Sequence, residues 1–281
     1  VENTLTVGLP GQQGAQELEA IGVAVRACRE AFDGLATRLD IAAAKTSLAK
    51  ARTAVQGLAG VLPEIDTRVR KWGEGLDALQ RATAGMVPIP AGRLNTPAAA
   101  VDAFFLAANE CSRAEFVQFQ AEVKAAVQGI DDAQKRFAAV ADRLAGAGLN
   151  ADRLRQLLDF EPAGAERAPV HRVTWYGAAA YAAWYGRQLP RPEEWALAAF
   201  GDGNANDFPW GNGWATSPDK RNIRSDVVDV DNGGASWRGP NLHHLAGNVA
   251  EWLAADPAAR EAQLAGGRFS DAEASAKDQA R

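Results

Sequence analysis

Residues 239–252 read G-P-N-L-H-H-L-A-G-N-V-A-E-W, and this stretch decides how the rest of the chain is interpreted. It opens with a turn-forming Gly-Pro-Asn lead-in and ends at the large apolar Trp252. Gly247 predicts a backbone bend with positive φ. The spacing of Asn248 and Glu251 fits two interpretations: a capping box at the start of a helix, or a hard-cation site in which Glu251 and backbone carbonyls surround calcium.

The same stretch resembles the P-N-G-L-Y-D-M-A-G-N-V-W-E-W signature of the formylglycine-generating enzyme family, the sulfatase-modifying-factor type. Further segments resemble this family in the same order: M-V-P-I-P-A-G-R-L at 86–94, F-F-L-A-A-N-E-C-S-R-A-E-F-V-Q-F at 104–119, V-T-W-Y-G through E-W-A-L-A-A-F-G within 169–201, F-P-W-G-N at 208–212, and Gly266-Gly267. The ordered matches make the resemblance specific. It implies an α+β domain with a compact variant of the C-type lectin fold over residues 85–281.

Composition is typical of a globular chain with room for two domains. The chain has 281 residues, of which 47% are hydrophobic and 23% charged, and a domain has about 150 residues. The net charge is −5 without a long basic run, so nucleic acid is not an expected partner. We expect no membrane span in this chain, because no apolar run approaches the roughly 18 residues required. Since the sequence begins at Val1, we expect a processed or shortened form. Composition does not indicate a compartment.

Residues 1–84 are predicted to form an α-helical bundle or a coiled-coil stalk. After a glycine-rich, irregular lead-in over residues 1–14, apolar residues recur at steps of three and four. The three seams are Leu18, Ile21, Val25, Cys28, Phe32, Leu35 and Leu39; Ile41, Ala44, Leu48, Ala51, Val55, Leu58 and Leu62; and Ile65, Val69, Trp72, Leu76 and Leu79. The phase changes at Asp40, and Pro63 does not suit a helix interior. The helices either form a bundle within one chain or join copies into an oligomer.

Residues 120–168 are predicted to be a helical insertion in the 85–281 domain. Apolar residues at helical spacing are Val123, Val127, Ile130, Phe137, Val140, Leu144, Leu154, Leu157 and Leu158. The segment is long for a loop and has apolar faces of its own. We therefore expect it to pack on the N-terminal helices.

The resemblance implies copper-dependent oxidation of a substrate cysteine. In that family two cysteines after the Gly-Gly pair hold copper(I), a soft ion that thiolates suit. Counted from Gly266-Gly267, their positions are Asp271 and Ala276. The two cysteines of this chain, Cys28 and Cys111, lie in core-type positions and are too few for a disulfide framework. We therefore expect no copper and no catalytic residues, and keep the copper-dependent formylglycine-generating oxidoreductase as the alternative.

The calcium sites implied by the resemblance carry over poorly. One would use Gly247, Val249 and Glu251, together with a side chain at the position of His244, and histidine is a poor ligand for a hard cation. The other would use a downstream aspartate, for which the candidates are Asp226, Asp229 and Asp231. Calcium is therefore kept as an alternative to the expectation of no cofactor.

These observations favour a non-catalytic module that binds a protein or a small-molecule ligand. The residues expected to contact that ligand are Trp237, His243, Arg268, Phe269 and Asp271. A particular form of this hypothesis is the variable protein of a diversity-generating retroelement. The chain has no G-x-S-x-G, phosphate-loop or H-E-x-x-H pattern that would indicate another catalytic class.

Overall fold

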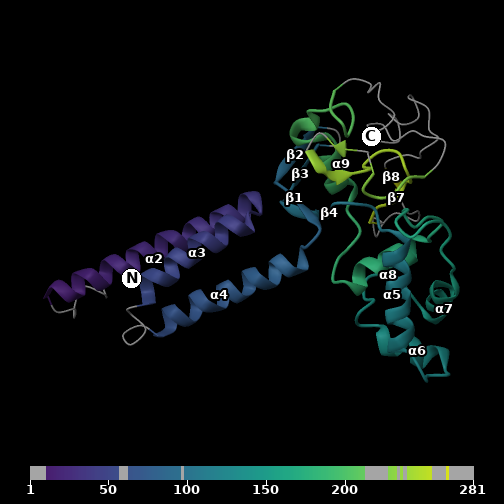
Figure 1. Cartoon of the computed structure of the whole chain (residues 1–281), viewed down its shortest axis with the longest axis horizontal. Helices are drawn as coiled ribbons and strands as arrows, with labels where there is room; N and C mark the ends of the chain where they lie inside the picture. Colours follow the sequence, from purple (N-terminus) through teal and green to yellow (C-terminus); the bar gives the residue numbers. More distant parts are fainter. Residues whose placement is uncertain are drawn as a thin grey trace. The chain divides into compact units, whose positions relative to one another are not determined.

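The computed structural model describes residues 11–56, 63–95, 98–212, 227–232, 235–236, 239–254 and 264–265. The chain divides into two compact units, which we call the helical unit (residues 1–91 and 102–105) and the mixed unit (residues 92–101 and 106–281). Helices come first, and short strands and further helices follow (Figure 1). This confirms the predicted combination of an N-terminal helical region and a mixed domain. Among the described helices, none is both long and apolar enough to cross a membrane.

The helices of the helical unit are α2 (Gly11–Arg38), α3 (Ile41–Val55) and α4 (Pro63–Ala82). The phase change predicted at Asp40 is confirmed, because its side chain accepts a hydrogen bond from Ala43 N and caps α3. The residue before it, Leu39, has a φ of 53°, which separates α2 from α3. Pro63 stands at the start of α4, where its missing N–H costs no hydrogen bond. The predicted lead-in is wrong at its end, because α2 already begins at Gly11.

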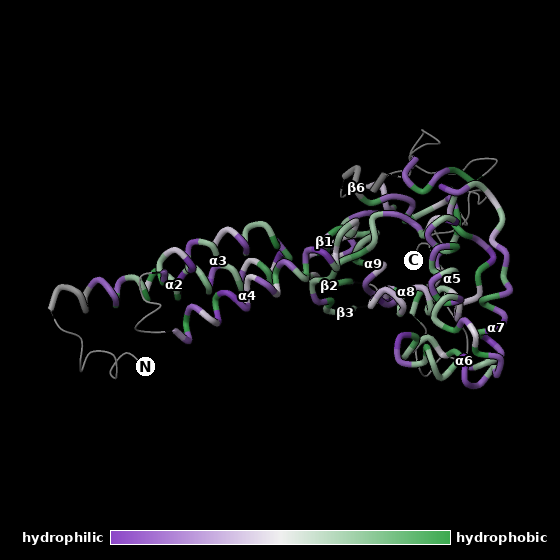
Figure 2. Tube along the Cα trace, turned by 60° about the horizontal axis from the view of Figure 1, so that its bottom comes forward, coloured by the Kyte–Doolittle hydropathy of each residue, from purple (hydrophilic) through white to green (hydrophobic). Residues whose placement is uncertain are grey.

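The core of the helical unit consists mostly of small side chains. Its buried members are Ala24, Ala27, Ala31, Ala44, Leu48, Ala51, Val55, Val69 and Leu76. Small residues let helix backbones approach closely, and α2 packs on α3 through its alanines. Figure 2 shows hydrophobic and hydrophilic stretches mixed along these helices, as expected for amphipathic segments. The predicted seam of the second helix is confirmed up to Val55, and its last two leucines lie outside the described residues.

The predicted seam of the first helix is wrong at two positions. Val25 is 62% exposed and Phe32 is 48% exposed, because the alanine face of α2 and not the larger residues faces α3. Trp72 of the third seam is also 39% exposed. Its ring meets that of Phe32 edge to face, with centroids 5.0 Å apart. We call Val25, Phe32 and Trp72 the apolar ridge.

The strands are short, and those that the structure describes form two-stranded sheets. They are β1 (Met86–Ile89) with β4 (Phe104–Ala107), β2 (Gly92–Asn95) with β3 (Ala98–Val101), β5 (Ala235–Ser236) with β6 (Gly239–His243), and β7 (Glu251–Trp252) with β8 (Leu264–Ala265). The family-like segment 86–94 thus contributes to two strands, β1 and β2. In the β2–β3 pair Gly92 lies opposite Val101. A Cβ on Gly92 would meet Leu197 at 2.7 Å, so glycine allows β2 to pass close to that side chain.

The helices of the mixed unit each begin after a residue in extended conformation. They are α5 (Arg113–Ala126), α6 (Ala133–Val140), α7 (Ala151–Asp159), α8 (Trp175–Trp184) and α9 (Pro192–Phe200). Ser112 and Glu115 form a capping box on α5. After α9, the single turn η2 (Asp202–Asn204) places the Asp202 carboxylate 2.7 Å from the N–H of Arg93 in β2. The loop that follows α9 therefore holds β2 through this hydrogen bond. The polar composition of the loop alone did not indicate this role.

The predicted helical insertion exists, but its predicted packing partner is wrong. Its apolar face belongs to one cluster with α5 and α8, whose buried members are Phe116, Phe119, Val123, Val127, Val140, Leu144, Ala147, Leu154, Leu157, Ala179, Ala180 and Trp184. The stripes that we expected to meet the N-terminal helices are thus used within the mixed unit. Gln120, 4% exposed, lies in this core and donates to the carbonyls of Leu157 and Phe160 at the end of α7.

Candidate functional site

Residues 244–248 form a loop that is buried along its length, although loops normally run over the surface. His244, Gly247 and Asn248 have φ values of 54°, 80° and 56°. The predicted bend at Gly247 is therefore confirmed. The capping-box interpretation is wrong: Asn248 starts no helix, since a helix N-cap has extended φ and ψ, and Glu251 opens strand β7.

The side chain of Asn248 joins this loop to residues 227–232. Its Oδ1 accepts from Val228 N at 3.0 Å, and its Nδ2 donates to Val228 O at 3.2 Å. The amide thus pairs with both backbone groups of one residue, as a neighbouring strand would. Asn248 has no exposed surface, and these bonds satisfy its buried polar atoms.

Glu110 is the third partner in this network. Its Oε2 accepts from Asn248 Nδ2 at 2.6 Å, and its Oε1 accepts from Val249 N at 3.2 Å. Burial raises the pKa of Glu110 to about 8, although both hydrogen bonds favour the charged form. We call Glu110, Val228, Asn248 and Val249 the asparagine network. The sequence reasoning gave Glu110 no role; its place before Cys111 in the family-like 104–119 segment was the available signal.

Glu251 is a second buried carboxyl near this network. Burial, and then the charge of Glu110, hold its pKa well above the usual range. The side chain of Trp195 acts on Glu251 in the opposite direction and lowers this pKa, but by less than burial raises it. The strand that carries Glu251 is held from its far side, because Trp252 Nε1 donates to Val173 O at 2.9 Å. In this environment the side chain of Glu251 is more readily a protonated carboxylic acid than a charged metal ligand.

The first predicted calcium site does not fit a hard cation. Calcium takes six to eight oxygen ligands, whereas the candidates are the carboxyl of Glu251 and the backbone carbonyls of Gly247 and Val249. The remaining position is occupied by the fully buried imidazole of His244, which brings no oxygen. Within the described part of the chain, no group of three or more histidine, cysteine, aspartate or glutamate side chains is placed to hold a metal ion.

Two of the aspartates that are candidates for the second calcium site form ion pairs with an arginine, and Asn222 and Ile223, where that site would begin, lie outside the described residues. Arg167 Nε lies 3.4 Å from Asp229 Oδ2, and its Nη2 donates to Asp231 Oδ2. Both carboxylates therefore lie beside one guanidinium, whose single positive charge offsets one of their two negative charges. Asp226, the third candidate, lies outside the described residues.

Neither cysteine is placed as a reactive thiol. Cys111 packs partly buried against the core of the mixed unit, and its Sγ donates to Ser112 O at 3.5 Å. Burial raises the pKa of the Cys111 thiol to about 12. Burial also raises the pKa of Cys28, which lies in the helical unit. Each of the two units thus contains one cysteine of this sequence.

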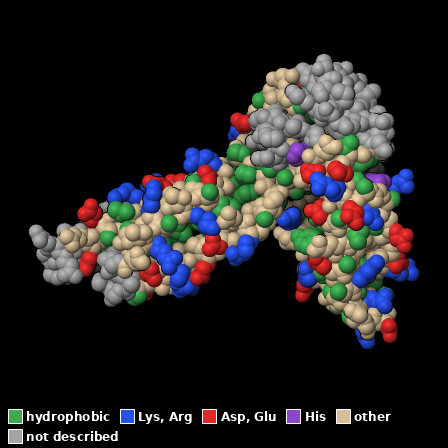
Figure 3. Space-filling view, viewed as in Figure 1, with side chains coloured by type: hydrophobic (Ala, Val, Ile, Leu, Met, Phe, Trp, Pro, Cys, Tyr) green, Lys and Arg blue, Asp and Glu red, His purple; other side chains and the backbone are tan. Residues whose placement is uncertain are grey.

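The predicted ligand-contact residues are only partly described. His243 ends β6, is partly buried and donates its backbone N–H to Ala108 O at 2.9 Å. Its ring lies 6.0 Å from that of His244. Trp237, Arg268, Phe269 and Asp271 lie outside the described residues, as does Ala276. Figure 3 shows acidic and basic side chains interspersed over the described surface in that view, without a large field of one sign.

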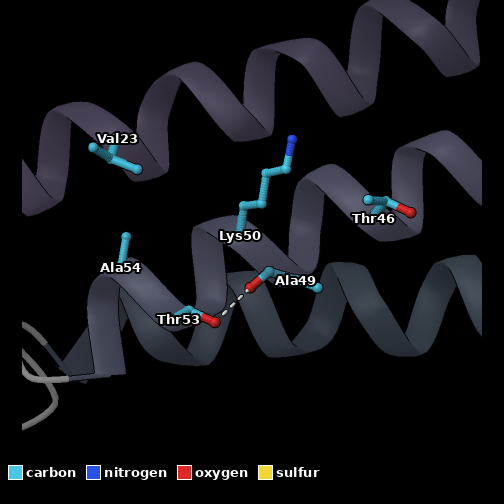
Figure 4. A pocket seen from close by; sticks show the side chains of 6 residues that line it. All are labelled: Val23, Thr46, Ala49, Lys50, Thr53 and Ala54. Atoms are coloured by element: carbon cyan, nitrogen blue, oxygen red, sulfur yellow. Dashed lines mark hydrogen bonds between the residues drawn. The ribbon is translucent and has the colours of Figure 1, made fainter.

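A surface groove of about 550 Å³ lies between α2 and α3 of the helical unit. Its lining residues are Val23, Thr46, Ala49, Lys50, Thr53 and Ala54 (Figure 4). The Thr53 hydroxyl is turned back to the carbonyl of Ala49, at 3.1 Å. Lys50 is then the one titratable side chain in the lining, so the groove offers apolar contact and no catalytic chemistry.

Comparison with known proteins shows which family and which relatives the chain is similar to. The family described as "Sulfatase-modifying factor enzyme 1-like domain" matches residues 76–281. The chain is 41% identical over 96 residues to the serine/threonine-protein kinase Pkn1 of Chlamydia trachomatis, covering 34% of this chain and 15% of the kinase. It is 35% identical over 130 residues to the mouse protein named inactive C-alpha-formylglycine-generating enzyme 2, covering 40% and 42%. It is 38% identical over 99 residues to the formylglycine-generating enzyme of Thermomonospora curvata, covering 31% and 33%. Each match spans less than half of the relative.

Proposed function

The chain belongs to the family of sulfatase-modifying factor enzyme 1-like domains, and from this premise we propose that its mixed unit is a non-catalytic module that binds a protein or a small-molecule ligand. The ligand face that we propose is formed by the loops near His243 and residues 227–232, with Trp237, Arg268, Phe269 and Asp271. The scaffold is the compact variant of the C-type lectin fold that the family signatures imply. In this function the domain binds its ligand on a surface and catalyses no oxidation.

The state of Cys111 is the observation that carries this proposal. It is the one cysteine of the mixed unit in this sequence, and burial holds its thiol protonated at neutral pH, with a pKa of about 12. A copper(I) site in this unit would need two thiolates. The likeness to a protein named inactive supports the same reading, since family members of that kind exist.

A copper(I) titration of the full-length natural protein tests the proposal. Competition with a chromophoric copper(I) chelator should show no ion bound more tightly than the chelator holds it. The double variant Cys28→Ser and Cys111→Ser is the matched control and should give the same curve. In parallel, a cysteine-containing peptide incubated with the protein, copper and oxygen should keep its thiol mass.

The opposite result has a clear form. One copper ion bound per chain and lost in a cysteine variant, together with oxidation of the peptide cysteine, would replace the binding module by the copper-dependent oxidoreductase. A particular version of the binding-module proposal is the variable protein of a diversity-generating retroelement. An imperfect repeat of the segment around residues 237–271 beside the gene would support that version, and its absence would remove it.

We also infer that the helical unit joins two copies of this chain. The apolar ridge exposes Val25, Phe32 and Trp72, while the groove between α2 and α3 is lined mainly by alanine and threonine. Large side chains on one surface and small ones on another are complementary in size, so a second copy supplies both halves. Sedimentation equilibrium should show association of the natural chain and a monomer for Phe32→Ser combined with Trp72→Ser. A natural chain that stays monomeric would refute this inference.

A further inference from the structure

We propose that Arg167 takes the place of a bound cation in the mixed unit, so that residues 227–232 are held without calcium. This goes beyond the proposed binding function and does not depend on it. It starts from the observation described above: two of the three aspartates that are candidates for a cation ligand under the family resemblance, Asp229 and Asp231, face a guanidinium.

Residues 227–232 are held at several points by backbone hydrogen bonds. Val228 pairs with the Asn248 amide through both its N–H and its carbonyl. Val230 N donates to Arg167 O at 3.0 Å. With its amide turned to satisfy its neighbours, Asn109 donates to Val230 O at 3.1 Å. The segment is therefore held between Asn248 and Arg167, and it turns at residues 229–232, where Asn232 N donates to Asp229 O at 2.9 Å.

This turn places the carboxylates of Asp229 and Asp231 beside the same guanidinium. Two carboxylates in that arrangement repel each other unless a cation lies between them. Arg167 supplies that charge: its Nε faces Asp229 and its Nη2 donates to Asp231. The guanidinium lowers the pKa of Asp231, mainly through this hydrogen bond, so the charged form is favoured. The fork of an arginine suits two separate oxygens better than the single point charge of lysine.

The backbone on either side of Arg167 is held by hydrogen bonds, which fixes the point from which its side chain extends. The first N–H groups of a helix lack partners within it, and those of α5 are satisfied by the residues on either side of Arg167. Arg113 N donates to Ala168 O at 2.8 Å, and Ala114 N donates to Glu166 O at 3.0 Å. Arg167 thus faces residues 227–232 with both its carbonyl and its guanidinium from a rigid position at the start of α5.

These contacts predict that calcium leaves the natural protein unchanged and acts only when the arginine is removed. Thermal unfolding followed by tryptophan fluorescence should give the same Tm for the natural protein in millimolar calcium and in chelator. Arg167→Ala should lower the Tm in chelator by about 2–4 °C, since an exposed ion-pair network contributes only modestly to stability. Millimolar calcium should restore part of that loss, because the two freed carboxylates become available to it.

Arg191→Ala is the matched control. Arg191 also lies beside two carboxylates, Glu193 and Glu194, at 2.9 and 3.1 Å, but they cap α9. That variant should lose stability without gaining a response to calcium. Hydrogen exchange gives a local check: the amides of Val228 and Val230 should exchange faster in Arg167→Ala than in the control.

Three results would overturn the proposal. The first is a natural protein whose Tm rises with calcium. The second is an Arg167→Ala variant with an unchanged Tm and unchanged exchange at Val228 and Val230. The third is a calcium response of Arg167→Ala no larger than that of Arg191→Ala. None of these measurements involves copper or the proposed ligand, so failure here is separable from failure of the binding-module proposal.

Discussion

The helical unit and the mixed unit both bury apolar clusters, but they build them from side chains of opposite size. The cluster of the helical unit is mostly alanine, with Ala44 and Ala51 at 1% and 0% exposure. The cluster of the mixed unit is centred on aromatic rings, with Phe119 at 0% exposure and 5.5 Å from Phe116 between ring centroids. An aromatic side chain buries about 150–250 Å², so the mixed unit gains more from each core position.

The difference teaches what each unit leaves on its surface. Close helix packing through alanine excludes larger side chains from the interface, and these remain outside as the apolar ridge. The mixed unit draws its rings inward and instead buries polar groups, such as Asn248, that need partners. One unit therefore depends on small volume at its core, and the other on large rings and a satisfied network.

The largest expected effect comes from truncating the aromatic core. Phe119→Ala should lower the free energy of unfolding of the mixed unit by about 3–5 kcal/mol, because it leaves a cavity among rings that cannot collapse. Denaturant unfolding followed by tryptophan fluorescence measures this, since seven of the eight tryptophans lie after residue 91. Val117→Ala, on the exposed side of the same helix, should change the value by less than about 0.5 kcal/mol. Equal losses in the two variants would contradict an aromatic core.

The next effect is a pH dependence confined to the mixed unit. The pKa of Glu110 is raised from 4.5 to about 8, so between these values the folded state binds more protons than the unfolded state. The stability of the mixed unit should therefore fall as pH rises from about 5 to 8, by at most about 1.4 kcal/mol per pH unit, and level off above.

Glu110→Gln is the control for that pH dependence. It removes one of the two buried carboxyls whose pKa is raised, so it should reduce the fall between pH 5 and 8, at the cost of one hydrogen bond to Asn248 or Val249; Glu251 accounts for the fall that remains. The cluster of the helical unit contains only apolar residues and Cys28, so helical circular dichroism of that unit should not follow the same curve. A rise in stability with pH, or a fall that is as steep in Glu110→Gln as in the natural protein, would contradict this assignment.

A smaller effect should come from enlarging the alanine core. Ala51→Leu should cost about 1–3 kcal/mol, because the added methylenes have no space between helices this close. Ala42→Leu is the matched control at an exposed position of α3 outside the groove and should be nearly neutral. Far-ultraviolet circular dichroism during thermal unfolding reports both variants. If Ala51→Leu were neutral or stabilising, the close packing of this unit would be wrong.

The smallest effect concerns the apolar ridge. Phe32→Ser combined with Trp72→Ser should change the stability of a monomer by less than about 1 kcal/mol, because both rings are exposed. The measurement is made at a concentration at which the natural chain sediments as a monomer. A loss of several kcal/mol would show that these rings belong to the core, and the contrast between the two units would then disappear.

The sequence predicted the kinds of elements well and their partners less well. The break at Asp40 was predictable because its side chain acts locally, over three residues. The seam of α2 was misassigned because Val25 and Ala24 are neighbours on the helix, and a spacing of three and four does not say which one faces α3. The insertion was helical as predicted, but its apolar face packs in one cluster with Phe116 and Trp184. Tertiary packing, which the sequence pattern does not contain, decides that partner.

The candidate site shows the same limit. The bend at Gly247 was predictable from glycine alone, but the role of Asn248 was not. Asparagine is common both in a capping box and in a loop with left-handed backbone. Here the hydrogen bond from Val228 N to Asn248 distinguishes the two. Likewise, no spacing rule links Arg167 to Asp231, because the pair is 64 residues apart and is made by the fold.

The asparagine network also sets the order in which the mixed unit can be completed. Its bonds from Asn248 and Val249 to Glu110 close sequence separations of 138 and 139 residues. Closing so long a loop costs chain entropy before any contact repays it, and folding slows as contacts become more distant in sequence. During synthesis, Glu110 leaves the ribosome long before Val249 exists, and its carboxyl stays solvated until then. The network therefore forms as a late step of folding, and a nascent chain that stops short of residue 249 cannot assemble it.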